Sequence, residues 1–218
     1  MHVQTSTLGK LSMGYGGYTC NWGVHMCGLY ESDSEYEDLV YNFLHQGDVD
    51  GERVRFFHRE PTPDRFLREY GQRFPQEADH PRDGTRFTLL SSMQRCFPNG
   101  RFEPLAQDPK LRALRDSAIA GPAPIRGAAD MDWVLEGIPG SELLLPYEAR
   151  LNPILDGVPA VMTCIYDLRK FPGSTIMGVL RTHRFAITRG MIVENPYYDP
   201  AKILKEHGVD WPPILSER

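Results

Sequence analysis

Residues 24–57 read VHMCGLYESDSEYEDLVYNFLHQGDVDGERVRFF and contain an apolar strand, a helix and a second strand in succession. The first strand covers 24–30. Ser32 and Glu35 follow it as a capping box, which predicts the start of a helix. Apolar residues then recur at helical spacing as far as Leu44, and Gly47 ends the pattern. The second strand covers 53–57. A strand–helix–strand unit of this kind favours parallel strands.

The same alternation continues along the chain. Further strands are predicted at 87–91, 125–129 and 158–167, and helices at 64–74, 108–120, 131–136, 143–151, 174–182 and 201–207. Two short apolar runs flank Arg189-Gly190, a pattern typical of a β-hairpin. We therefore predict a single α/β domain over 23–208, with a mostly parallel central sheet flanked by helices and a terminal β-hairpin. Residues 1–22 are predicted to be a flexible arm and 209–218 a tail.

The composition and net charge of the chain disfavour several classes of function. The chain has 218 residues, of which 41% are hydrophobic, enough for one domain with a sizeable core. A net charge of −5 disfavours direct nucleic-acid binding and a polybasic membrane patch. The sequence has no apolar run of roughly 18 residues and no signal peptide, so we expect a soluble, cytoplasmic protein. Its four cysteines form no C-x-x-C pair and are expected to be reduced.

Several segments in order resemble one family. They are 22–31 (WGVHMCGLYE), 43–53 with its FL-x-x-G and GER elements, 147–152 (YEARLN), 164–167 (CIYD), and LRTH at 180–183 with ENP-x-Y at 194–198. Together they resemble the MEDS sensory domain, named after methanogens, methylotrophs and a dichloromethane-responsive regulator. The resemblance implies a RecA-like α/β fold and a small-molecule sensory role, usually coupled to a histidine kinase, an anti-sigma-type kinase or a DNA-binding module.

The sequence departs from that family pattern in three places. About 20 residues follow the last match, which we interpret as too few for an output domain. His183 is followed by Arg184, where the family usually has proline. Residues 61–109 match no family motif, so the identity of the ligand does not carry over.

A RecA-like fold would place a phosphate-binding loop after the first strand. The corresponding turn, 31–35, reads ESDSE, with three acids and neither glycine nor lysine. Carboxylates at this helix N-terminus would repel a triphosphate. Gly9-Lys10 also fails as a phosphate-loop motif, because Gln4 and Leu11 stand where glycine and Ser/Thr are required. We therefore predict a degenerate fold that binds no ATP.

A ligand is still expected at the carboxyl ends of the strands, where open α/β sheets bind. The candidate ligand-binding residues are acids, aromatics and His/Cys pairs near these ends: His25, Cys27, Tyr30, Asp130, Trp133, Glu148, Tyr166 and His183. Each is also compatible with ordinary core packing. Glu148 and Arg150 are compatible with a solvated pair or a structural bridge, and a buried Glu148 would need a partner such as Arg126.

Three function classes stay open. The first is a signal-transduction module that binds a small organic ligand and acts through a separate output protein, a kinase or a transcription regulator; a homodimer is left open. The second is a metal or haem protein, with His25, Cys27, Cys164 and His183 as ligands. The third is an enzyme or biosynthetic accessory protein with Cys27 as nucleophile, for which no oxyanion hole is recognisable. We favour the binding module.

Overall fold

A computed structural model describes residues 10–58, 63–77, 86–93, 97 and 99–215 of the chain. Seven of the strands in this part form one sheet in the order β5-β4-β6-β7-β3-β8-β9, in which only β9 is antiparallel to its neighbour. The strands are β3 (Val24–Tyr30), β4 (Arg53–His58), β5 (Phe87–Ser91), β6 (Ile125–Asp130), β7 (Ala160–Asp167), β8 (Phe185–Thr188) and β9 (Met191–Glu194). The predicted α/β class with a mostly parallel sheet and a terminal hairpin is confirmed.

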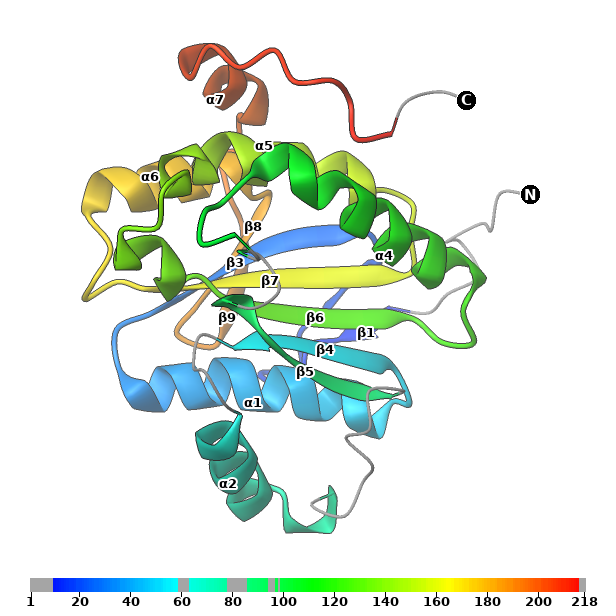
Figure 1. The fold of residues 1–218 in the computed structure, drawn as a ribbon. Helices are drawn as coiled ribbons and strands as arrows, with labels where there is room; N and C mark the ends of the chain where they lie inside the picture. Colours follow the sequence, from blue (N-terminus) through cyan, green and yellow to red (C-terminus); the bar gives the residue numbers. More distant parts are fainter. Residues whose placement is uncertain (1–9, 59–62, 78–85, 94–96, 98, 216–218) are drawn as a thin grey trace.

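Helices cover both faces of the sheet, as Figure 1 shows. The α-helices are α1 (Asp33–Val49), α2 (Asp64–Arg73), α4 (Asp108–Ala120), α5 (Leu144–Leu155), α6 (Gly173–Thr182) and α7 (Pro200–Glu206). The 3₁₀ turns are η2 (Pro75–Glu77), η3 (Pro104–Gln107), η4 (Asp132–Glu136) and η5 (Ser141–Leu143). α1 and α2 lie on one side of the sheet, and α4, α5 and α6 lie on the other (Figure 1). No helix in the described part of the chain is long and apolar enough to cross a membrane.

Alternation along β3 divides its side chains between two cores. Met26 packs with the core that α1 covers, whereas Cys27 and Leu29 pack on the face that α5 and α6 cover. His25 and Cys27 are two residues apart and therefore share this second face, as expected from the sequence. The register places Cys27 opposite Cys164 of β7.

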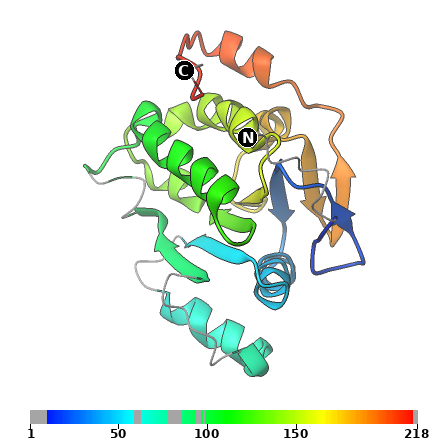
Figure 2. The same cartoon turned by 90° about the vertical axis from the view of Figure 1, so that its right-hand side faces the viewer.

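The N-terminal segment differs from the predicted flexible arm. Two short strands, β1 (Leu11–Ser12) and β2 (Thr19–Cys20), pair antiparallel, and Figure 2 shows this hairpin in dark blue beside the main sheet. Leu11 and Met13 are fully buried in the α1-side core. Strands of two residues are too short to show a hydrophobic period, so no pattern in the sequence predicts them. Residues 1–9 lie outside the described part.

Two further elements differ in detail from their predictions. The helix predicted at 131–136 is a 3₁₀ turn, η4. α5 continues past the predicted end at 151 and includes Pro153, which costs one backbone hydrogen bond. Ile154 and Leu155, which follow the proline, are buried, and their packing offsets that loss.

The terminal hairpin turns at Arg189 and Gly190, as predicted. Both residues have positive φ, 48° and 70°. Two consecutive left-handed residues are what a type I′ turn requires, and glycine at the second position adopts this conformation without steric cost.

Candidate functional site

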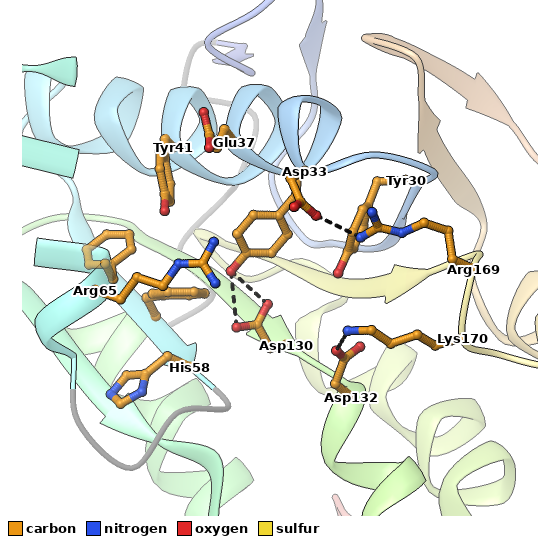
Figure 3. A pocket seen from close by; sticks show the side chains of 13 residues that line it. Tyr30, Asp33, Glu37, Tyr41, His58, Arg65, Asp130, Asp132, Arg169 and Lys170 are labelled. Atoms are coloured by element: carbon orange, nitrogen blue, oxygen red, sulfur yellow. Dashed lines mark hydrogen bonds and ion pairs between the residues drawn. The ribbon is translucent and has the colours of Figure 1, made fainter. Parts of the chain in front are cut away.

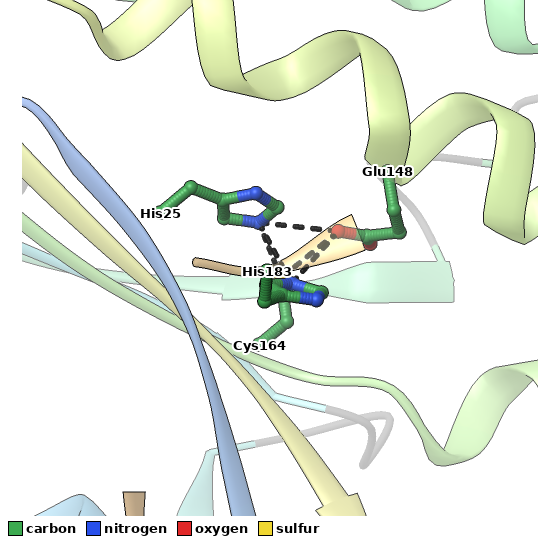
Figure 4. Close-up of side chains that lie close together, drawn as sticks. All are labelled: His25, Glu148, Cys164 and His183. Atoms are coloured by element: carbon green, nitrogen blue, oxygen red, sulfur yellow. Dashed lines mark hydrogen bonds and ion pairs between the residues drawn. The ribbon is translucent and has the colours of Figure 1, made fainter. Parts of the chain in front are cut away.

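Four side chains from four different elements meet in the interior between the sheet and α5. His25 lies near the start of β3, Cys164 in β7 and Glu148 in α5, and His183 is the residue that ends α6 before β8. Figure 4 shows their side chains converging. One donor atom from each side chain lies within 4.8 Å of all the others. We call these four residues the His–Glu–Cys cluster.

The contacts within the cluster are close. His25 Nε2 lies 3.1 Å from His183 Nε2, 3.1 Å from Glu148 Oε2 and 3.4 Å from Cys164 Sγ. Glu148 Oε2 lies 3.3 Å from His183 Nε2 and 3.6 Å from Cys164 Sγ. One carboxylate oxygen therefore faces two imidazole nitrogens and a sulfur at once.

Burial makes the electrostatics of the cluster unusual. Burial alone would raise the pKa of Glu148, but hydrogen bonds from His183 and His25 outweigh it and lower this pKa to about 2. Burial and the adjacent His183 lower the pKa of His25. Burial, with the nearby Glu148 carboxylate, raises the pKa of the Cys164 thiol well above its ordinary value. The site therefore holds a carboxylate in a low-dielectric interior.

Backbone contacts orient His183. Its Nδ1 lies 2.8 Å from the Val179 carbonyl oxygen, and the Thr182 hydroxyl lies 2.9 Å from the same nitrogen while donating to that carbonyl. Because a carbonyl only accepts, Nδ1 carries a proton. The other ring nitrogen, Nε2, therefore faces the cluster, 3.1 Å from His25 Nε2 and 3.3 Å from Glu148 Oε2.

A cavity of about 150 Å³ opens beside the cluster, between the sheet and the helices α4 and α5. His25, Glu148 and Cys164 line one part of it. Most of the remaining lining is apolar or aromatic: Phe57, Phe102, Leu111, Leu114, Ala129, Met131, Trp133, Tyr147, Leu151, Ile154, Leu155 and Met162. The cavity thus combines a predominantly apolar wall with a small group of polar atoms.

A second, smaller cavity of about 70 Å³ lies at the carboxyl ends of the strands, shown in Figure 3. Tyr36 donates its hydroxyl to both oxygens of Asp130, at 3.1 and 3.2 Å. Lys170 pairs with Asp132 at 2.6 Å, and Arg169 pairs with Asp33 at 2.8 Å. The charged groups here largely neutralise one another.

The turn before α1 uses its own side chains as caps. The Ser32 hydroxyl accepts from the Glu35 amide at 3.2 Å, and the Glu35 carboxylate accepts from the Glu31 amide at 2.7 Å. A carboxylate thus lies where a RecA-like fold would need to receive phosphate oxygens.

The predicted ligand-binding residues divide among these places. His25, Glu148 and His183 join the cluster, Trp133 lines the larger cavity, and Tyr30 and Asp130 line the smaller one. Tyr166 is buried against the rings of Phe171 and His183. Among the residues that the structure describes, it lines neither of these two cavities.

Two details of the prediction need correction. Cys27 was grouped with His25, Cys164 and His183, but Glu148 occupies the fourth place in the cluster, and the Cys27 thiol points to the Phe185 carbonyl at 3.8 Å. Arg126, the example given above of a partner for a buried Glu148, forms a buried pair with Glu52 at 2.6 Å instead. The helical position of Glu148 in α5 brings it over the two histidines instead. Sequence analysis did not identify Phe102 as part of the cavity wall, because it lies in the 61–109 segment that matches no family motif.

The family profile described as "MEthanogen/methylotroph, DcmR Sensory domain", MEDS, matches residues 24–184. The chain belongs to the MEDS family. This match covers most of the chain and contains all four residues of the cluster. It assigns this MEDS domain a sensory or regulatory role in broad terms.

Solved structures place the MEDS domain of this chain in the RecA-like fold. The KaiC-like protein PH0186 from Pyrococcus horikoshii OT3 has a TM-score of 0.52 at 13% identity, covering 82% of this chain and 79% of that one. The flagellar accessory protein FlaH from Methanocaldococcus jannaschii has a TM-score of 0.51 at 12% identity, covering 81% and 77%. A search of curated proteins gives no match. The predicted RecA-like fold is confirmed.

Proposed function

We propose that this MEDS domain senses a small, uncharged organic molecule, which binds in the cavity beside the His–Glu–Cys cluster. The observation that carries the proposal is the make-up of this cavity, an apolar and aromatic wall with His25 and Glu148 at one part. Binding sites commonly combine an apolar lining with a few fixed polar groups that orient the ligand.

The cavity volume supports a ligand about the size of benzene. Apolar cavities of about 150 Å³ in other proteins stay dry and take up benzene or xenon. The cavity here is of that size, about 150 Å³. A porphyrin is far larger, so the volume argues against haem in this position.

We propose further that the domain acts through a separate output protein, a kinase or a transcription regulator, and does so without nucleotide hydrolysis. Family membership supports the first part. The second part is supported by the Glu35 carboxylate, which accepts from the Glu31 amide at the turn where phosphate would bind. Calorimetry with ATP and magnesium should show no binding, and a micromolar dissociation constant, about 8 kcal/mol, would contradict this part of the proposal.

Benzene and phenol are suitable first probes of the cavity. A ligand at 100 times its dissociation constant raises the free energy of unfolding by about 2.7 kcal/mol, which thermal unfolding detects readily. Fluorescence gives a second readout, because Trp133 lines the cavity and its emission should change on binding.

A matched pair of variants locates the binding. Ala129 lines the cavity on β6, so Ala129→Leu should fill part of it and abolish the stabilisation by benzene. Ala113→Leu makes the same chemical change at an exposed position of α4 and should leave binding unchanged. Equal binding by both variants, or no stabilisation of the wild-type protein by either probe, would refute the proposed site.

A further inference from the structure

Five of the six separations among the ligand atoms of the cluster are close to those around one tetrahedral zinc ion, and the sixth, between His183 Nε2 and Cys164 Sγ, is no more than 4.8 Å. Zinc bonds of about 2.0–2.2 Å to nitrogen or oxygen and about 2.3 Å to sulfur place neighbouring ligand atoms about 3.3 Å apart, or about 3.6 Å where one is sulfur. The observed nitrogen–nitrogen and nitrogen–oxygen separations are 3.1, 3.1 and 3.3 Å, and those to sulfur are 3.4 and 3.6 Å.

We propose that His25, Glu148, Cys164 and His183 bind one Zn²⁺ ion, through the two Nε2 atoms, Glu148 Oε2 and Cys164 Sγ. Two imidazoles, a carboxylate and a thiolate are all ligands that zinc accepts. The site adjoins the cavity of the proposed function but does not require that an organic ligand binds there.

The charges of the cluster also favour a bound divalent cation. Glu148 is buried, and its ion-pair contacts within the described part of the chain are with the two histidines, not with any lysine or arginine. Isolated charges are costly in the interior. A divalent cation with one carboxylate and one thiolate sums to zero. The Cys164 thiol would release its proton to solvent as the zinc–sulfur bond forms, so binding releases one proton per ion.

The surroundings of His183 resemble those of a metal ligand. A histidine that binds metal through one ring nitrogen usually donates its other N–H to a carbonyl or a carboxylate, which fixes the ring. The Val179 carbonyl plays that part here, at 2.8 Å. Thr182, whose hydroxyl donates to the same carbonyl at 2.9 Å, fixes the position of the acceptor.

Cobalt substitution tests the site directly. The full chain is freed of metal with a chelator and titrated with Co²⁺, which gives a thiolate-to-metal charge-transfer band and intense visible bands in a tetrahedral site. We expect one equivalent to bind with both features, and Zn²⁺ to displace it. Absence of the charge-transfer band in the wild-type protein would overturn the proposal.

Two cysteine variants identify the sulfur ligand. Cys164→Ala should abolish the charge-transfer band, whereas Cys27→Ala, at the position paired with Cys164 in the sheet, should retain it. Loss of the band in Cys27→Ala alone would overturn the assignment. Circular dichroism confirms that each variant is folded, and Cys164→Ser provides a closer replacement if the alanine variant is not.

Glu148→Gln keeps the size of the side chain and removes its charge. It should retain the charge-transfer band but bind Zn²⁺ at least 10-fold more weakly in competition with a chromophoric chelator; unchanged affinity would exclude Glu148 as a ligand. Benzene binding to the metal-free protein is measured separately. If the protein binds benzene but not zinc, the zinc site is wrong; if it binds zinc but not benzene, the proposed organic-ligand site is wrong.

Discussion

His25 and His183 are 158 positions apart in the chain, yet their Nε2 atoms lie 3.1 Å from each other in the interior. The fold produces this approach by pairing β3 with β8 in parallel with Met26 opposite Phe185, so that His183, two residues before β8, comes beside the start of β3. The two rings are tilted by 46° with centroids 4.1 Å apart, so they also contact each other directly. Both histidines thus direct a ring nitrogen to the Glu148 carboxylate.

Removing Arg126 should strongly destabilise the domain. Its guanidinium is fully buried, bonds both oxygens of Glu52 at 2.6 and 2.9 Å, and donates to the carbonyls of Phe43 and Ser12. Arg126→Ala leaves the Glu52 charge unpaired in the core and should cost about 3–5 kcal/mol in chemical denaturation. Arg184→Ala, which breaks an exposed pair with Glu194, should have an effect near zero. Similar losses in both variants would contradict this reading of the buried pair.

The N-terminal hairpin should contribute to stability as part of the core. Leu11 is 1% exposed. Leu11→Ala should therefore lower the free energy of unfolding by roughly 2–5 kcal/mol. Leu105→Ala, at a side chain that is 45% exposed, should change it little and serves as the control. If Leu11→Ala behaves like Leu105→Ala in denaturant titrations, the segment does not pack as described.

Gly47 should resist replacement although it lies inside a helix. Alanine would normally favour the helix by about 1 kcal/mol, but its Cβ would come within 2.7 Å of the Arg126 side chain. That side chain is held by its bonds to Glu52, so Gly47→Ala should destabilise by roughly 1–3 kcal/mol. Gly173→Ala meets no atom within 4 Å and should be neutral or slightly stabilising. If chemical denaturation shows that Gly47→Ala raises the free energy of unfolding, the Arg126 side chain is free to move.

Asp167 should make the free energy of unfolding of the domain fall at acidic pH. Burial alone would raise its pKa, but hydrogen bonds from Arg169 and Lys170 outweigh this effect and hold the pKa of Asp167 well below its usual range. A lowered folded-state pKa contributes stability above the unfolded value of about 4, and this contribution is lost as the pH falls further. Asp167→Asn should therefore destabilise at pH 7, and its difference from the wild-type protein should shrink in acid. A constant difference across the titration would contradict the assignment.

The sequence predicted β7 well because most of this strand is a continuous apolar run. In β7, six of the predicted residues, 160–165, are nearly all buried, as a parallel strand covered on both faces requires. It predicted less of the site. Alternation placed His25 and Cys27 on one face, but the proximity of Glu148 to His25 depends on how α5 is rotated over the sheet. Such a rotation results from packing between distant segments and leaves no periodic signal in the chain.

The position of α5 has a consequence for how a sensory domain could report its state. Glu148 reaches the cluster from α5, and α5 also contacts α7, which forms the outermost layer above it (Figure 1). In the described part of the chain, α5 therefore links the cluster in the interior to α7 at the outside. A rearrangement of the donors around Glu148 would act directly on α5, and α7 packs against this helix.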